Sequence, residues 1–123
     1  MRQEGLDPVI LDAGDLFFST SVLDDSNRVS EQFRANAILK GYEKIGCDAI
    51  NVGEYELSAG LGFLLESAQK SPIPFISANL RFSDNYKLIF DPYLLIRRSG
   101  LTIGVIGLTN LVPKTINLSL IHI

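Results

Sequence analysis

The chain has 123 residues, 46% of them hydrophobic and 20% charged, a balance typical of one globular domain or part of one. The net charge of -3 and the lack of a clustered basic face exclude a nucleic-acid surface, since the adjacent Arg97 and Arg98 would point to opposite sides of a strand. The single cysteine, Cys47, excludes an internal disulfide and a cysteine-based zinc site, and no run approaches the roughly 20 apolar residues of a membrane-spanning helix.

The first half of the sequence predicts a strand, a long helix and a second strand. Residues 8–13 (PVILDA) form a nearly continuous apolar run, as expected of a strand buried on both faces. Residues 28–46 predict a helix that ends at Gly46, where a glycine can form the C-terminal cap. Residues 48–52 (DAINV) predict a second buried strand. The residues at helical spacing on the expected inner face of the helix are Val29, Phe33, Ala37, Ile38, Tyr42 and Ile45.

The second half predicts a helix, a strand and a hairpin. Ser58 can cap a helix over residues 59–70, with Leu61, Leu64, Leu65 and Ala68 on one face. Residues 72–80 predict a third strand, and residues 93–109 predict two apolar strands joined across Ser99-Gly100. The alternation of strands and helices predicts an α/β layered sheet with parallel pairing at its centre.

Acidic residues follow two of the predicted strands, each just behind a glycine. Gly14 and Asp15 follow the first strand, and Gly53 is followed by Glu54, Tyr55 and Glu56. Ligands of such sheets bind at the carboxyl ends of the strands, where a glycine lets the backbone turn sharply and approach a ligand. The alternative is that Asp15 caps a loop and the glutamates favour the start of the following helix through its dipole. Spacing alone leaves both interpretations open.

The order of these segments resembles the metal-dependent phosphoesterases of the calcineurin-like superfamily, and in particular their 5'-nucleotidase-like branch. The resemblance rests on "VILDAGDLFFSTS", "ANAILKGYEKIGCDAINVGEYELSAGLGFL", "PFISANL" and "LTIGVIGLTN", which together cover roughly residues 8–110. The family has a strand ending in Asp-Ala-Gly-Asp, and a later strand leading into Gly-Asn-His-Glu. The resemblance implies a partial metallophosphoesterase fold, an α/β/β/α sandwich.

The resemblance implies roles for three residues. Asp15 matches the family aspartate that bridges two divalent metal ions (Zn, Mn, Fe or similar), and such a carboxylate holds the ions about 3.5 to 4 Å apart for in-line displacement at phosphorus. Glu54 occupies the position of the metal-binding asparagine, and its carboxylate keeps an oxygen ligand. Tyr55 occupies the position of the histidine that contacts phosphate and assists the leaving group, whereas Glu56 matches the trailing acid.

The implied function is two-metal hydrolysis of a small phosphorylated substrate, with a nucleotide as one candidate, in an extracytoplasmic (periplasmic) protein. The alternative is a non-catalytic binding or accessory module with the same fold, because a phenol at position 55 suits proton transfer near neutrality less well than an imidazole. A plain doubly wound domain, such as a receiver, is a third interpretation. It is weakened because the lysine that receiver domains need is missing.

The family also needs an Asp-x-His pair upstream and a Gly-His-x-His downstream, whereas His122 is the only histidine of this chain. We therefore expect residues 1–117 to be a fragment of a metallophosphoesterase domain that is inactive alone. Residues 118–123 (LSLIHI) match the translation of a transposon-derived sequencing adaptor, and we expect them to be an artefact.

Overall fold

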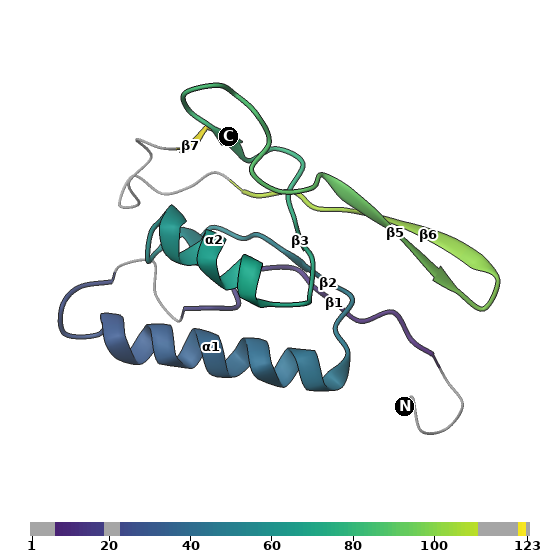
Figure 1. Cartoon of the computed structure of the whole chain (residues 1–123), viewed down its shortest axis with the longest axis horizontal. Helices are drawn as coiled ribbons and strands as arrows, with labels where there is room; N and C mark the ends of the chain where they lie inside the picture. Colours follow the sequence, from purple (N-terminus) through teal and green to yellow (C-terminus); the bar gives the residue numbers. More distant parts are fainter. Residues whose placement is uncertain (1–6, 19–22, 111–120, 123) are drawn as a thin grey trace.

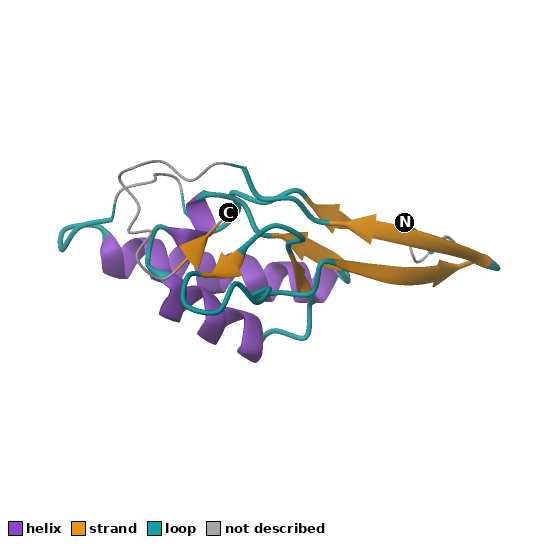
Figure 2. Cartoon of the chain, turned by 90° about the horizontal axis from the view of Figure 1, so that it is seen from above, coloured by secondary structure: helices purple, strands orange, loops and turns teal. Residues whose placement is uncertain are grey.

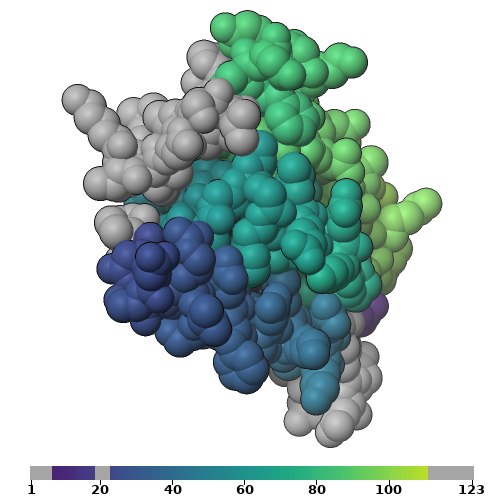
Figure 3. All heavy atoms as spheres, turned by 60° about the vertical axis from the view of Figure 1, so that its left-hand side comes forward, coloured from purple at the N-terminus to yellow at the C-terminus, as the bar shows by residue number. Residues whose placement is uncertain are grey.

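The computed structural model describes residues 7–18, 23–110 and 121–122. Its centre is a parallel three-stranded sheet in the order β1 (Leu11–Asp12), β2 (Ala49–Asn51) and β3 (Phe75–Ile76). Two helices, α1 (Arg28–Ile45) and α2 (Leu61–Lys70), lie side by side on the same side of this sheet (Figure 1). Figure 3 shows the outer surface that they form. The predicted α/β class with central parallel pairing is confirmed.

The register of the sheet aligns the ends of its strands. Leu11 pairs with Ala49, and Ile50 pairs with Phe75. The strands are shorter than predicted, with two or three residues each, although they lie within the predicted ranges. Because all three run in the same direction, the loops after β1 and β2 leave from the same edge of the sheet.

Helix α1 ends where the sequence predicts, but it packs through a different face. Gly46 follows the helix with a left-handed φ of 78°, a conformation that costs glycine little. The buried residues are Ala35 and Leu39, one turn apart, whereas Val29 and Phe33 are 79% and 76% exposed. The predicted inner face was therefore wrong for Val29, Phe33, Ala37 and Ile45, all exposed, and correct in part for Ile38 and Tyr42.

Helix α2 begins later than predicted. Residues Tyr55–Leu57 form a separate single 3-10 turn, and Ser58 follows that turn instead of capping the helix. Gly60 precedes α2 with a φ of 92°, which separates the two elements. The predicted N-cap at Ser58 was therefore wrong, because Gly60, with its positive φ, separates Ser58 from the start of the helix.

Aromatic rings fill the space between the helices and the sheet. Phe17, just after β1, has ring-centroid distances of 5.9 Å to Phe18, 6.2 Å to Phe63 and 5.9 Å to Phe75. Phe17 is 0% exposed, and Arg34 of α1 donates a hydrogen bond to its backbone oxygen at 2.9 Å. The loop that carries Asp15 is thus anchored in the core by Phe17, two residues further along the chain. The other members of this core are Phe18, Ala35, Leu39, Cys47, Ile50, Val52, Leu57, Leu64, Ile73, Phe75 and Leu80.

The predicted hairpin is confirmed as a ribbon that extends away from the helices. Strands β5 (Tyr93–Arg98) and β6 (Leu101–Ile106) pair antiparallel, and Ser99 and Gly100 form the turn with φ values of 51° and 78° (Figures 1 and 2). At the base of the ribbon, the backbone N–H of Ala78 donates a hydrogen bond to the backbone oxygen of Gly107 at 2.7 Å. This bond joins the ribbon to the segment after β3. A further small antiparallel pair joins β4 (Arg81–Phe82) to β7 (Ile121–His122).

No helix of the described ranges covers the second face of the sheet. Leu11 in β1 is 49% exposed, so the prediction of a first strand buried on both faces was wrong for these residues. A largely apolar groove of about 290 Å³ lies on this face. It is lined by Leu11, Asp12, Ala13, Ala49, Asn51, Ile76, Val105, Ile106 and Leu108. Neither helix in these ranges combines the length and the hydropathy that a bilayer crossing requires.

Candidate active-site edge

The loops after β1 and β2 meet in backbone contact. A Cβ atom added to Gly14 would lie 2.7 Å from the backbone nitrogen of Gly53. One added to Gly53 would lie 2.5 Å from the backbone nitrogen of Asp15. Real Cβ atoms do not approach other atoms so closely, so both loops need glycine for a steric reason. The two glycines of the predicted site are therefore brought together as the parallel sheet requires.

Asp15 takes an unusual backbone conformation at this junction. Its φ is 57°, in the left-handed region that residues other than glycine rarely adopt. Its Oδ1 atom accepts a hydrogen bond from the backbone N–H of Tyr55 at 2.8 Å. Its Oδ2 atom accepts no hydrogen bond from the described residues, and the residue is exposed. One carboxylate oxygen thus holds the neighbouring loop while the other is open to a ligand.

Glu56 is a buried carboxylate that joins both loops. Its Oε2 atom accepts hydrogen bonds from the backbone N–H groups of Asp15 and Gly53, both at 2.9 Å, and its Oε1 atom accepts one from Leu16 at 2.6 Å. Burial raises the pKa of the Glu56 carboxyl, and the N–H groups of Leu16 and Asp15 oppose this shift. Glu56 therefore holds the loop that carries Asp15, and Asp15 holds the loop that carries Glu56, each by accepting hydrogen bonds from backbone N–H groups.

Asp12 supports the turn into Gly14 from the helix side. Its Oδ1 atom accepts a hydrogen bond from the backbone N–H of Gly14 at 2.8 Å, and its Oδ2 atom accepts one from the Tyr42 hydroxyl at 2.8 Å. The hydrogen bond to Asp12, together with burial and the negative charge of Asp12, raises the pKa of Tyr42 to about 12. Helix α1 is thereby tied to the strand end that carries Asp15.

Polar side chains also join the third strand and the hairpin to this edge. Asn51 donates to the backbone oxygens of Ala13 at 2.9 Å and Leu108 at 2.8 Å. The Thr109 hydroxyl donates to the backbone oxygen of Val52 at 2.7 Å, and Asn79 exchanges two hydrogen bonds with the Thr109 backbone. All the loops that leave this edge are thus connected by hydrogen bonds.

The side chains of Glu54 and Tyr55 are half-buried beside this junction. Within residues 7–18, 23–110 and 121–122, no group of three or more His, Cys, Asp or Glu side chains is arranged to hold a metal ion. The junction thus brings Asp15 to the backbone of residues 53–55 without completing a metal site from these residues.

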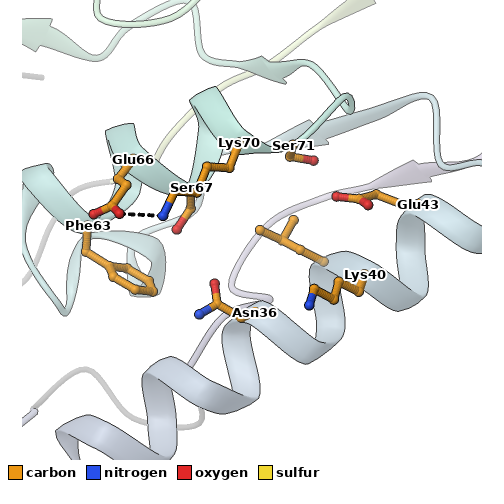
Figure 4. Close-up of a pocket in the computed structure, with 9 residues that line it drawn as sticks. Asn36, Lys40, Glu43, Phe63, Glu66, Ser67, Lys70 and Ser71 are labelled. Atoms are coloured by element: carbon orange, nitrogen blue, oxygen red, sulfur yellow. Dashed lines mark hydrogen bonds and ion pairs between the residues drawn. The ribbon is translucent and has the colours of Figure 1, made fainter.

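A different groove, of about 370 Å³, lies between α1 and α2 and contains none of the predicted site residues. Figure 4 shows its polar lining, with Lys70 paired to Glu66 at 2.6 Å across from Asn36 and Lys40. Its two lysines, Lys40 and Lys70, are exposed, and Lys70 is paired with Glu66. The edge at Asp15 is the better candidate site.

No protein-family profile matches the chain. A 5'-nucleotidase from Vibrio parahaemolyticus is 32% identical over 109 residues, which is 89% of this chain and 18% of that protein. The solved structure of a 5'-nucleotidase precursor from Thermus thermophilus superimposes with a TM-score of 0.68 at 29% identity, covering 85% of this chain and 20% of that structure. The chain is related to the 5'-nucleotidase-like metallophosphoesterases.

Other relatives agree with this metallophosphoesterase relationship. The protein UshA of Salmonella pullorum is 32% identical over 109 residues, or 18% of its length. The calcineurin-like phosphoesterase YfkN from Bacillus subtilis shares the fold, with a TM-score of 0.61 at 20% identity over 82% of this chain and 34% of that structure. The predicted partial metallophosphoesterase fold is confirmed, and the chain spans less than a fifth of the length of the first curated relatives.

The sequence does not predict the roles that Glu56 and Asn51 have at this edge. The pattern predicts Glu56 to be a trailing acid or a helix-dipole residue, and Asn51 only to be part of a strand. The available signal for Glu56 was its place three residues after Gly53 in a run with no cation, a spacing that lets a carboxylate turn back to its own loop. Nothing in the sequence distinguishes the side chain of Asn51, because its partners lie 38 and 57 residues away.

Proposed function

We propose that the protein of which these residues are part is a metal-dependent phosphoesterase that hydrolyses phosphate esters in the manner of a 5'-nucleotidase. The observation that carries the proposal is the exposed Asp15 carboxylate, held at the carboxyl edge of a parallel sheet with one oxygen open, in a chain related to 5'-nucleotidases. Hard divalent cations prefer such oxygen ligands.

Asp15 and Glu54 are the proposed metal ligands of this chain. The donors fit a divalent cation in type, since both are carboxylates, and Asp15 is exposed. Further ligands would come from other parts of the protein. A bound metal pair activates water and stabilises charge on phosphoryl oxygens. Asp15 would hold the cations, and the hydrogen bond from Tyr55 N–H would fix the orientation of its carboxylate.

The substrate class that this proposal implies is a small phosphorylated compound, with nucleotides as the first to test. Two divalent ions, of zinc, manganese, iron or a similar metal, are the proposed cofactors. The extracytoplasmic location stays a prediction of the resemblance.

Replacing Asp15 with alanine tests the proposal in the product of the complete gene, loaded with Mn²⁺ and assayed on a chromogenic phosphate ester. The loss of a ligand worth several kcal/mol of transition-state stabilisation should lower kcat/KM by about 100-fold or more. The matched control is Asp84→Ala, which removes an exposed aspartate from a turn outside this edge. An unchanged rate for Asp15→Ala would remove Asp15 from the mechanism.

The second candidate function is a non-catalytic module, favoured by Tyr55 at the position where the related family carries a histidine. Its backbone is held by Asp15, so a histidine introduced there would start from the same place. If the protein is a catalyst with a weakened proton donor, Tyr55→His should raise kcat by at least about tenfold, within the range of general acid–base catalysis. No gain in kcat, with Mn²⁺ binding retained, would favour the binding module.

A further inference from the structure

Glu56 connects the two loops of the candidate site without pointing at a ligand itself. It is 0% exposed, and both of its carboxylate oxygens are occupied by backbone N–H groups of Asp15, Leu16 and Gly53. Among the described residues no cation forms an ion pair with it. A buried carboxylate is costly unless it is well hydrogen-bonded, so its persistence here depends on these three donors.

The three donors are the groups that fix the conformation of the proposed metal ligand. Two of them belong to Asp15 and its neighbour Leu16, and Asp15 has a φ of 57°. Such a conformation costs on the order of 1–3 kcal/mol and persists only where surrounding contacts hold it. The carboxylate of Glu56 is the group that holds it, since it binds the N–H groups on either side of the Asp15 carbonyl carbon.

The connection is reciprocal. Glu56 comes from the loop after β2 and holds the loop after β1, whereas Asp15 comes from the loop after β1 and accepts the N–H of Tyr55 in the loop after β2. The third donor, Gly53 N–H, immediately precedes Glu54. A change at Glu56 would therefore move the backbone of both proposed ligands, Asp15 and Glu54, relative to each other.

We propose that Glu56 is a positioning residue that sets the separation and direction of the Asp15 and Glu54 carboxylates for divalent-cation binding. The inference rests on the proposed function for the identity of the two ligands. Glu56 itself does not contact the cation, because its oxygens are already used by the backbone. Its effect is transmitted through three hydrogen bonds to the chain segments that carry the ligands.

The test is the Mn²⁺ affinity of Glu56→Gln in the product of the complete gene, measured by calorimetry without substrate. A glutamine keeps the size of the side chain, but its NH₂ group would face a backbone N–H, so at least one of the three bonds is lost. Groups that orient metal ligands typically contribute 10–100-fold to affinity, and we expect a loss of about that size. Glu56→Asp keeps the charge but is one methylene shorter. Its Mn²⁺ affinity should lie between those of the wild type and Glu56→Gln.

The control is Leu64→Ala, which empties a fully buried site in α2 and lowers stability without removing any of the hydrogen bonds that join the two loops. Both variants are compared at a temperature where circular dichroism shows them folded. A loss of Mn²⁺ affinity in Glu56→Gln but not in Leu64→Ala supports positioning. Equal losses, or no loss in Glu56→Gln, would overturn it, and if Glu56→Gln does not fold, Glu56→Asp decides by the same comparison.

The outcome is separable from that of the proposed function. A wild-type protein that binds Mn²⁺ through Glu56-dependent loops but hydrolyses no phosphate ester would contradict the phosphoesterase proposal and leave the positioning role intact. A wild-type protein that binds no Mn²⁺ would contradict both.

Discussion

Replacing Gly53 with alanine is expected to destabilise the fold by about 3 kcal/mol, at the upper end of the cost of overpacking. The new Cβ would lie 2.5 Å from both the backbone nitrogen and Oδ1 of Asp15, and 2.9 Å from Oε2 of Glu56. Because the first of these is a backbone atom, it cannot rotate away, and the two loops must separate. Separation breaks the hydrogen bonds that join Glu56 to Asp15 and Leu16. Urea denaturation followed by circular dichroism measures the change.

The matched control is Gly41→Ala in the middle of α1. A Cβ at Gly41 meets no atom within 4 Å, and alanine is favoured over glycine in a helix. This variant should therefore gain about 0.5–1 kcal/mol. Opposite signs for the two Gly→Ala substitutions are expected only if the loops after β1 and β2 are in contact. A neutral Gly53→Ala would contradict that contact.

Replacing Phe17 with alanine is expected to cost about 3–5 kcal/mol, the usual range for a large buried aromatic residue. Its ring is fully buried against Phe18, Phe63 and Phe75, two residues beyond Asp15. The loss leaves a cavity under the site loop, so the melting temperature should fall by on the order of 10–20 °C. Thermal unfolding followed by circular dichroism measures the shift.

Phe33→Ala in α1 removes a ring of the same size that is 76% exposed, and should change stability by no more than about 0.5 kcal/mol. A cost close to that of Phe17→Ala would show that the outer face of α1 is covered in solution.

Much of the fold was predictable because its signals are local. The end of α1 at Gly46 follows from the conformational freedom of glycine, and the turn of the hairpin follows from Ser99-Gly100. The parallel pairing of β1, β2 and β3 was predictable from the alternation of strands and helices alone. Each of these depends on a few neighbouring residues or on the order of elements.

The packing of α1 was not predictable in the same way, because the helix carries two apolar stripes. Val29, Phe33 and Ala37 recur every four residues, as do Ala35 and Leu39. Both stripes have the same helical spacing. A prediction from the sequence therefore favours the stripe with the larger side chains. The structure buries Ala35 and Leu39 instead, because the small side chain of Ala35 lets the helix lie close to the core.

The sequence by itself determined the order of elements, the relationship to metallophosphoesterases and the position of Asp15 behind a strand and a glycine. These depend on residue identity and spacing. Only the tertiary structure decided that Gly14 and Gly53 touch, that Asp15 is left-handed and that Glu56 is buried between the two loops. The physical reason is that two of the three partners of Glu56, the N–H groups of Asp15 and Leu16, are about 40 residues away, and every residue except proline carries such a group. No residue pattern marks which of them a carboxylate will meet, so that contact exists only once the sheet has brought the loops together.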